Sequence, residues 1–560
     1  MRSSSGSPEE GRGVSPLLMA ATLGPRRSRS AVPPCHHGRL RPPRPVAVTT
    51  PEGPMHRRKL LTALGLGGAA IGAGALSACG GGSDDASGAP GRAAGAAAGG
   101  AGATSTTAPT PTVAPTPYDP SRPYWVQGNF APVAAEETVT ELAVTGEIPA
   151  ELTGLFVRNG SNPATGEALH WFLGDGMVHG VRLDGGKALW YRNRYVTTPL
   201  QQSGKGLMEF GGVPGQQNNQ SNVAVVEHGG RFLSLGEVGW PYEMSTEDLS
   251  TVGPFDYAGK LGPTMTAHPK VDPETGRMHF FGYEFMRPAL TYYAADSDGT
   301  LDVVSPITVP ATTMIHDFAV TDRDAVFWIG PVVFGPDPTG TSQIPFHWDP
   351  TGPSRIGVMP LDGSGADIRW VDVPPSFAFH GYNAHRDGDD VVLRVHRADE
   401  AFGPKGDLVS TLLTEWRIGT AGPSLTFAEE QISDRPMDLP SHDRRRTGRE
   451  TRHGWFVTTT SPDSEYGFEL EGICHLDLRT GKEDVWDPGP HRRGGEPFFV
   501  GADSSRPDGD GWVLTYVWDR TTDRSSLAVF DAQYVASGPV GEVQLPVRVP
   551  FGFHGTWIPA

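Results

Sequence analysis

Over most of the chain, apolar residues come in short runs separated by polar turns. Between about Tyr118 and Ala560 no segment carries a long apolar pattern of period 3.6, which an amphipathic helix would need. Glycine pairs and Asp-Gly pairs, which are typical of hairpin turns, separate many of the runs. The pattern predicts short antiparallel strands, among them 154–158, 177–183, 223–227, 231–235, 278–285, 391–396, 511–518 and 526–530.

The length of this strand-rich part predicts one closed all-β body. Roughly 440 residues without a break in composition fit a propeller of about seven blades, although no sequence repeat marks the blades. Three longer stretches lack a clear strand pattern, and we expect them to form a loop cap over the propeller axis and the way in for a substrate. These stretches are residues 199–221, 331–356 and 434–453.

Composition narrows the class of protein. The chain has a formal net charge of −18, which argues against a nucleic acid as partner. Its 73 glycines and 52 prolines suit a turn-rich β protein. Only three cysteines are present, Cys35, Cys79 and Cys474, so neither a disulfide framework nor a cysteine-built zinc site is expected.

The N-terminal part has the pattern of a bacterial export signal. Residues 1–54 are rich in arginine, proline and serine without periodicity, and we expect a disordered leader or an upstream start that is not used. Residues 55–79 combine a basic stub, an apolar run and three small or apolar residues before Cys79. This order is typical of a lipoprotein signal, and the pair Arg57-Arg58 indicates the twin-arginine export route.

We therefore expect Cys79 to carry the lipid and the protein to be exported and anchored to the outer face of the bacterial cell membrane. Residues 80–117, rich in Gly, Ala, Thr and Pro, predict a flexible linker, and residues 118–560 form the expected folded domain. The alternative is an uncleaved transmembrane anchor, because the apolar run approaches spanning length. The glycines within that run weaken this alternative.

Four histidines lie in apolar, turn-flanked settings and are candidate ligands of one metal. They are His268, His316, His380 and His554, separated by 48, 64 and 174 residues. Such wide spacing fits no local metal motif, but it fits ligands that separate blades contribute around a central axis. Neutral imidazoles suit iron, zinc, copper or nickel, whereas calcium and magnesium prefer oxygen ligands. The alternative for each is a hydrogen-bonded core histidine, since the chain has 18 histidines.

A set of longer motifs occurs in a characteristic order. They are 152–163 (LTGLFVRNGSNP), 170–180 (HWFLGDGMVHG), 266–269 (TAHP), 314–318 (MIHDF), 379–384 (FHGYNA), 495–500 (GEPFFV) and 553–555 (FHG). In these motifs the chain resembles the carotenoid cleavage oxygenase family, which also contains stilbene-cleaving dioxygenases and the retinoid isomerase of the eye. The resemblance runs from about Tyr124 to the C-terminus.

The resemblance implies a seven-bladed propeller with one Fe(II) per chain on its axis, held by the four histidines. It also implies three carboxylates that hydrogen-bond ligand imidazoles, and the matching positions are Glu237, Asp438 and Glu496. Such a carboxylate fixes the tautomer of the imidazole and aims its other nitrogen at the metal. The family usually has glutamate where this chain has Asp438, so we expect the shorter arm to reach its histidine through water. The alternative for each carboxylate is a solvated loop position.

The remaining histidines and the loop aromatic residues are not expected to bind the metal. Four further histidines, His170, His179, His385 and His396, are expected to be structural. Aromatic residues in the loops are candidates for an apolar tunnel, although some must belong to the core. These aromatic candidates are Trp171, Phe172, Phe210, Trp240, Tyr242, Phe334, Phe377, Phe379, Phe551 and Phe553.

The reaction that the resemblance implies is oxidative scission of a carbon–carbon double bond. Both atoms of O₂ end in two carbonyl products, and neither nicotinamide nor flavin is needed. The expected substrate is an apolar carotenoid or apocarotenoid. A stilbene-type alkene is the alternative, with Lys205 as a candidate for holding its phenol. A non-catalytic binding lipoprotein and a calcium-dependent hydrolytic propeller fit four histidines less well, and the oligomeric state stays open.

Overall fold

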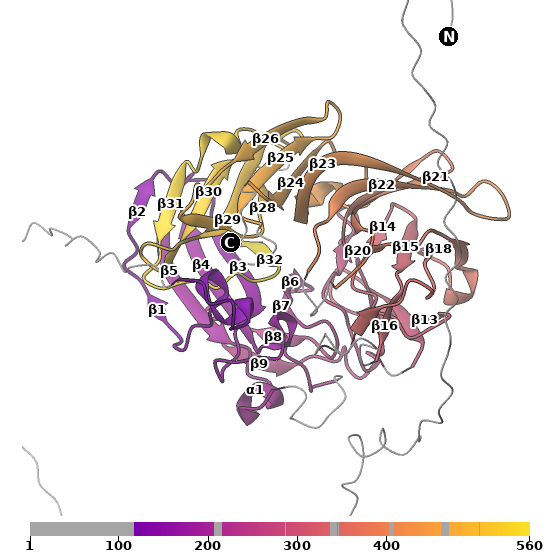
Figure 1. Ribbon diagram of the computed structural model, residues 1–560, viewed down its shortest axis with the longest axis horizontal. Coiled ribbons are helices and arrows are strands. Elements are labelled where there is room, and N and C mark those ends of the chain that lie inside the picture. Colours follow the sequence, from indigo (N-terminus) through magenta and orange to yellow (C-terminus); the bar gives the residue numbers. More distant parts are fainter. Residues whose placement is uncertain are drawn as a thin grey trace, which may run out of the picture. The chain divides into compact units, whose positions relative to one another are not determined.

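Figure 1 shows a computed structural model of the protein, which describes residues 117–206, 216–285, 287–335, 344, 346–402, 408–460, 470–502 and 505–560. The predicted leader (1–54), the export signal with Cys79 (55–79) and the linker up to residue 116 lie outside the described residues. Their boundaries therefore stay predictions.

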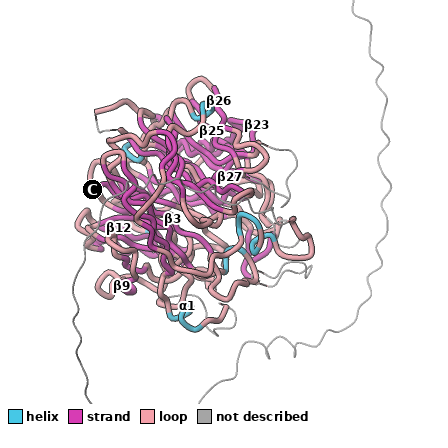
Figure 2. The backbone as a smooth tube through the Cα atoms, turned by 90° about the vertical axis from the view of Figure 1, so that its left-hand side faces the viewer, coloured by secondary structure: helices cyan, strands magenta, loops and turns pink. Residues whose placement is uncertain are grey.

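The described part is almost entirely β, as predicted. In Figure 2 strands and loops fill the domain, and helical segments are few and short. The helical elements are α1 (Pro199–Ser203) and the 3₁₀ segments η1 (Tyr124–Val126), η2 (Gly128–Phe130), η3 (Trp171–Leu173), η4 (Gly365–Asp367), η5 (Arg444–Arg446) and η6 (Val535–Ser537). None of the helices in these described ranges has the length and apolarity needed to cross a membrane.

The strands form antiparallel sheets that follow one another around a common centre (Figure 1). The first sheet has the order β1 (Thr138–Val139), β5 (Lys187–Tyr195), β4 (Gly176–Asp184), β3 (Gly154–Ser161), β32 (Gly555–Pro559). The second consists of β6 (Ala224–His228), β7 (Arg231–Leu235), β8 (Tyr242–Met244) and β9 (Thr251–Pro254). The third consists of β10 (Lys270–Val271), β11 (Met278–Tyr283), β12 (Ala289–Ala295) and β13 (Leu301–Thr308).

The later sheets continue this order. The fourth consists of β14 (Phe318–Val320), β15 (Asp324–Ile329), β18 (Arg355–Pro360) and β19 (Arg369–Asp372), and a small ribbon pairs β16 (Val332–Phe334) with β17 (Phe346–Trp348). A larger sheet runs through β20 (Phe377–Asp387), β21 (Asp390–Ala398), β22 (Leu412–Gly419), β23 (Thr426–His442), β24 (His453–Thr458), β25 (Gly472–Asp477) and β26 (Lys482–Trp486). The last sheet has the order β2 (Val144–Gly146), β31 (Gly541–Gln544), β30 (Arg524–Asp531), β29 (Gly511–Asp519), β27 (Arg492–Gly494), with β28 (Phe498–Gly501) also on β29.

The seven-stranded sheet is two four-stranded units that share one strand. β23 is 17 residues long. Its first part, from Thr426 to Pro436, pairs with β22, and its second part, from Met437 to His442, pairs with β24. With this division, the described sheets of four or more strands make seven units around the centre. This arrangement agrees with the propeller predicted from the sequence.

Both ends of the domain close the ring. The C-terminal strand β32 pairs with β3 in the first sheet, with Leu155 opposite Ile558. Near the start of the described domain, β2 pairs with β31 in the last sheet, with Val144 opposite Val543. Strands from the two ends of the domain thus share the first and the last sheet, which closes the ring.

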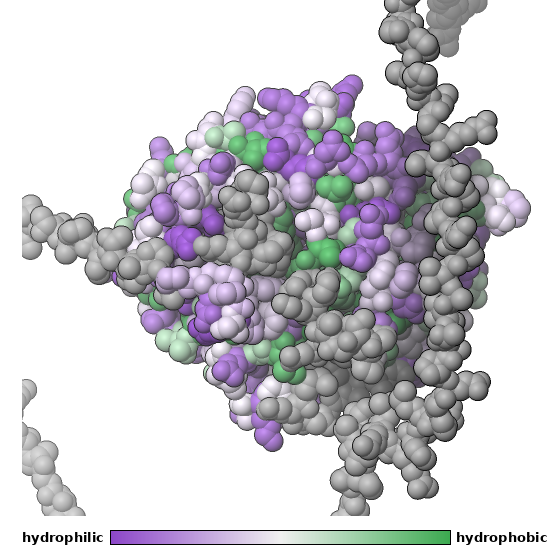
Figure 3. All heavy atoms as spheres, in the orientation of Figure 1, coloured by the Kyte–Doolittle hydropathy of each residue, from purple (hydrophilic) through white to green (hydrophobic). Residues whose placement is uncertain are grey.

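Neighbouring sheets bury both of their faces against each other. Every residue of β3, β11, β15, β24 and β25 is buried. Aromatic side chains fill the space between sheets, as where Trp455 stacks on Phe499 with ring centroids 4.3 Å apart. Polar residues are mostly outside, and the face in Figure 3 is largely hydrophilic with scattered hydrophobic patches.

The prediction of three irregular stretches is wrong in part. Residues 434–442 belong to β23, and β16 and β17 fall within 331–356. The second part of β23 lacks a regular strand pattern because its register shifts between Asp438 and Ser441, and Leu439 has a φ of 51°. A bulge of this kind admits residues that a regular strand pattern would not predict.

Candidate metal centre

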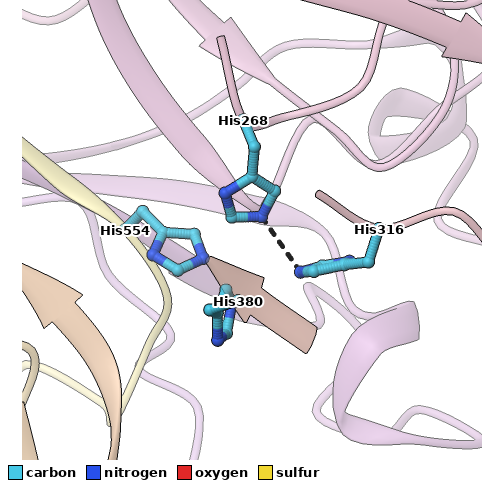
Figure 4. Close-up of side chains that lie close together, drawn as sticks. All are labelled: His268, His316, His380 and His554. Atoms are coloured by element: carbon cyan, nitrogen blue, oxygen red, sulfur yellow. Dashed lines mark hydrogen bonds between the residues drawn. The ribbon is translucent and has the colours of Figure 1, made fainter. Parts of the chain in front are cut away.

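The four predicted histidines come together, with their rings pointing toward one another (Figure 4). His268 lies just before β10, His316 just before β14 and His554 directly before β32, while His380 lies within β20. They come from four different sheet units. One ring nitrogen from each lies within 4.8 Å of those from the others, which no other group of three or more His, Cys, Asp or Glu achieves among the described residues.

The imidazoles are tightly grouped and inclined to one another. The ring centroids of His268 lie 4.5 Å from His316, 4.6 Å from His554 and 5.3 Å from His380. The Nε2 atoms of His268 and His316 are 3.0 Å apart. If two nitrogens each lie about 2.1 Å from one ion and the N–ion–N angle is a right angle, the nitrogens are separated by about the same distance as these two Nε2 atoms.

Three carboxylates hold the far nitrogens of three of these rings. Glu496 Oε1 lies 2.7 Å from His554 Nδ1, and its other oxygen accepts from the Gly555 amide at 2.7 Å. Glu237 Oε2 lies 2.8 Å from His316 Nδ1, a close ion-pair contact that lacks the alignment of a hydrogen bond. The structure therefore brings the predicted glutamates to the predicted histidines.

The expectation of a water-mediated contact for Asp438 is wrong. Its Oδ1 lies 2.6 Å from His380 Nδ1, so the contact is direct. The irregular backbone of β23 at this point brings the shorter side chain close enough. Asp438 is further fixed by the Leu439 amide at 2.7 Å and the Thr411 hydroxyl at 3.1 Å.

Other residues that support these carboxylates were not predicted from the sequence. The Tyr283 hydroxyl donates to Glu237 Oε1 at 2.7 Å. The side chain of Arg158 in β3 is buried near Glu496, and burial lowers the pKa of its guanidinium to about 10, although Tyr516 and Glu496 oppose this shift. A buried arginine in a strand is a sequence signal for such a role, but it does not identify the carboxylate that it serves.

Burial favours the neutral form of two of the four imidazoles, His268 and His380, by lowering their pKa. Burial lowers the pKa of His268 well below its ordinary value, and the neighbouring imidazoles lower it further. Burial also lowers the pKa of His380, although Asp438 opposes this shift. For His316, burial would lower the pKa, but the charge of Glu237, with smaller contributions from Asp317 and Asp438, outweighs burial and the pKa is raised. Neutral imidazole is the form that binds metals.

The residues fit a transition metal. Nε2 of His380 is buried and has no hydrogen-bond partner, which is unfavourable unless another group binds it. Where a carboxylate contacts Nδ1, the lone pair of Nε2 is left free to bind a metal. Four imidazole nitrogens without a carboxylate among them suit iron, zinc, copper or nickel better than calcium.

Comparison with known proteins identifies the family. The retinal pigment epithelial membrane protein family matches residues 130–559 of the chain. A carotenoid cleavage oxygenase from Mycobacterium tuberculosis is 34% identical over 506 residues, which cover 78% of this chain and 97% of that protein. The chain belongs to the carotenoid cleavage oxygenase family. The resemblance seen in the sequence motifs is thereby confirmed.

Other members of the carotenoid cleavage oxygenase family are similar over the same part of the chain. An isoeugenol monooxygenase from Pseudomonas nitroreducens is 30% identical over 467 residues, covering 77% of this chain and 97% of that protein. The crystal structure of a Pseudomonas brassicacearum lignostilbene dioxygenase has a TM-score of 0.72 and 27% identity, covering 80% of this chain and all of that chain. The chain is accordingly an enzyme of the dioxygenase class of oxidoreductases.

An aromatic wall adjoins the four histidines of this oxygenase. The Phe379 ring lies edge-on to His316 at 5.3 Å, and Phe172 and Phe402 pack against Phe379 at 6.1 Å and 5.6 Å. Phe172 also contacts Phe553 at 5.9 Å. Phe402 was not among the predicted aromatic residues, and the predicted Phe210 lies outside the described residues.

The remaining candidates lie apart from the cluster. His179 Nδ1 is 2.9 Å from the Tyr191 hydroxyl, and His396 Nδ1 is 2.8 Å from the Met437 carbonyl. His170 accepts from the Phe172 amide at 3.2 Å, and His385 lies on the β20–β21 ladder opposite Val392. Lys205 is exposed after α1.

Buried histidines outside the cluster predict that the fold is sensitive to acid. Burial lowers the pKa of His279 and of His475 to about 4. Below about pH 6.5 the unfolded chain takes up protons that the folded chain does not, so stability falls as the pH falls towards 4. We expect a loss of about 1.4 kcal/mol per pH unit for each such histidine, measured by urea unfolding of metal-free protein.

Replacing these two side chains tests the cause. The variants His279→Gln and His475→Gln should each show a shallower fall in the free energy of unfolding between about pH 6.5 and 4. A slope unchanged in the double variant would show that these histidines do not cause the acid sensitivity.

Proposed function

We propose that this protein is a non-haem iron(II) dioxygenase that cleaves a carbon–carbon double bond of a carotenoid or apocarotenoid to give two carbonyl products. The observation that carries the proposal is the convergence of His268, His316, His380 and His554, three of them bound by carboxylates. One iron per chain would be held by these imidazoles.

The chain's own residues would prepare the site for this reaction. When bound, ferrous iron supplies the activation of O₂, and the alkene supplies the electrons, so no nicotinamide or flavin is required. The carboxylates of Glu237, Asp438 and Glu496 hold the imidazole Nδ1 protons and offset part of the cation's charge. The aromatic wall of Phe172, Phe379 and Phe402 would keep water out and contact an apolar polyene.

Iron binding provides the first test. Protein purified under reducing conditions should contain close to one iron per chain, and His316→Ala should lose it while keeping the far-ultraviolet circular dichroism of a β protein. His279→Ala is the matched control, because His279 is also buried but bonds to Tyr292 away from the cluster. Full iron occupancy in His316→Ala would contradict the assignment, and wild-type protein without any metal would favour a binding lipoprotein.

A stilbene-type alkene is the second candidate substrate. The similarity to a lignostilbene dioxygenase and an isoeugenol monooxygenase supports this alternative, whereas the 34% identity to a carotenoid cleavage oxygenase supports the first. Lys205, the candidate phenol-binding residue, is exposed, which weighs against its role.

The two substrates can be separated directly. Iron-loaded protein should convert an apocarotenal to two shorter carbonyl compounds and incorporate label from ¹⁸O₂ into both. A stilbenol supplied in parallel should turn over more slowly. Faster cleavage of the stilbenol would assign the protein to the phenylpropanoid branch, and no cleavage of either would count against an alkene-cleaving function.

We also propose that the mature protein is anchored to the outer face of the cell membrane through a lipid on Cys79. The support is the order of basic, apolar and small residues before this cysteine. A membrane-bound enzyme would lie close to substrates that dissolve in the bilayer.

Substituting the cysteine tests the anchor. In bacterial cells, Cys79→Ser should move the protein from the membrane fraction to the soluble or secreted fraction. Cys35→Ser and Cys474→Ser are controls that should remain with the membrane. Membrane retention of Cys79→Ser would favour the uncleaved transmembrane anchor instead.

A further inference from the structure

Asp317 is a buried carboxylate beside the histidine cluster that the proposed reaction does not use. It follows His316 directly, and its side chain is 1% exposed. Its oxygens accept hydrogen bonds from Lys270 Nζ at 2.8 Å, the Phe318 amide at 2.7 Å and the Gly381 amide at 2.8 Å. Hydrogen bonds to an ionised acceptor are among the strong ones, so this carboxylate is firmly oriented.

The three donors belong to segments that carry three of the ligand histidines. Lys270 begins β10 two residues after His268, and Gly381 lies in β20 directly after His380. Phe318 begins β14, in the same segment as the carboxylate itself. One side chain thus joins strands from three sheets, although 48 and 64 residues separate the histidines along the chain.

The backbone around His380 depends on this contact. The register of β20 with β21 shifts between Ala378 and Gly381, so a bulge falls at His380. A bulge re-aims a side chain and disrupts the ladder locally, and here Asp317 satisfies the Gly381 amide. A Cβ at Gly381 would lie 2.9 Å from the Trp328 ring, so the close approach of β20 requires glycine.

Asp317 holds the segments through its hydrogen bonds, none of which goes to an imidazole. Its Oδ1 lies 4.0 Å from His268 Nδ1, beyond hydrogen-bonding distance. Lys270 supplies an opposite charge at 2.8 Å, so the carboxylate is paired within the site. Asp317 therefore contacts the His268 segment through Lys270. It does not hydrogen-bond the His268 ring, as the other three carboxylates contact their own imidazoles.

We propose that Asp317 is a positioning residue for the metal, holding the segments of His268, His316 and His380 at the spacing that one divalent transition-metal ion requires. This inference rests on the proposed function, because it assumes that the cluster binds such an ion. Loss of the carboxylate should weaken metal binding more than it weakens the metal-free fold.

A Co²⁺ titration of metal-free protein tests the inference, since the visible absorption of Co²⁺ reports its ligands. Asp317→Asn keeps the size of the side chain but removes the charge that pairs with Lys270 and one of the acceptor oxygens. We expect the dissociation constant for Co²⁺ to rise about 10- to 100-fold in this variant. The rise in melting temperature that Co²⁺ produces should shrink in parallel.

Asp324→Asn is the matched control. Asp324 is a buried carboxylate in β15, on the same sheet as β14, and Arg386 binds its two oxygens at 2.6 Å and 2.7 Å. This substitution should lower the melting temperature of metal-free protein. It should leave the Co²⁺ dissociation constant within about twofold of the wild-type value, because its contact with β20 is at Arg386, six residues beyond His380 along the strand.

The possible results separate the inference from the proposed function. A wild-type Co²⁺ affinity in Asp317→Asn would overturn the positioning role, whereas failure of the wild-type protein to bind Co²⁺ would count against the metal site itself. If Asp317→Asn does not fold, Asp317→Glu replaces it, because one added methylene displaces the joined segments. A raised dissociation constant with an altered Co²⁺ spectrum supports the role, and an unchanged constant and spectrum contradict it.

Discussion

The four-histidine cluster imposes the main physical constraint on this domain, because four imidazole nitrogens must face one buried point. Without a cation, nitrogen lone pairs that face one another in a buried site are unfavourable, and the buried Nε2 of His380 has no hydrogen-bond partner. The carboxylates that hold the far nitrogens add three negative charges. A bound divalent ion offsets both effects, while Arg158 supplies buried positive charge near Glu496.

The closed ring of sheets meets this constraint because each ligand comes from a different sheet unit. His554 is the histidine farthest along the chain from the other three, since it lies close to the C-terminus and directly before β32. Since β32 completes the sheet of β3, near the start of the domain, closure of the ring and placement of the fourth imidazole are the same event. We therefore expect the metal site to form only in the fully closed fold.

The sequence was most informative where chemistry and spacing are both unusual. Histidines in apolar runs, together with ordered motifs, predicted the four histidines and the three carboxylates that the structure brings together. Strand-length runs and turn residues predicted the β class. The seven units could be inferred only from length, because β23 is shared by two of them and carries no sequence mark of that role.

Contacts that depend on local backbone geometry were beyond the reach of sequence reasoning. The direct bond from Asp438 to His380 relies on a bulge in β23, which an alternation pattern does not reveal. Asp317 was missed because its partners lie 47 and 64 residues away, although an acid next to a ligand histidine in an apolar run was a visible signal. Phe402 was missed because aromatic residues are common in any core.

Anomalous diffraction at the iron edge, from crystals of anaerobically prepared protein, tests the central claim most directly. The account predicts a single strong peak at the centre of the ring, about 2.0–2.2 Å from one nitrogen each of His268, His316, His380 and His554. An iron-loaded crystal with no peak at this point, or with the four imidazoles turned away from it, would contradict the account.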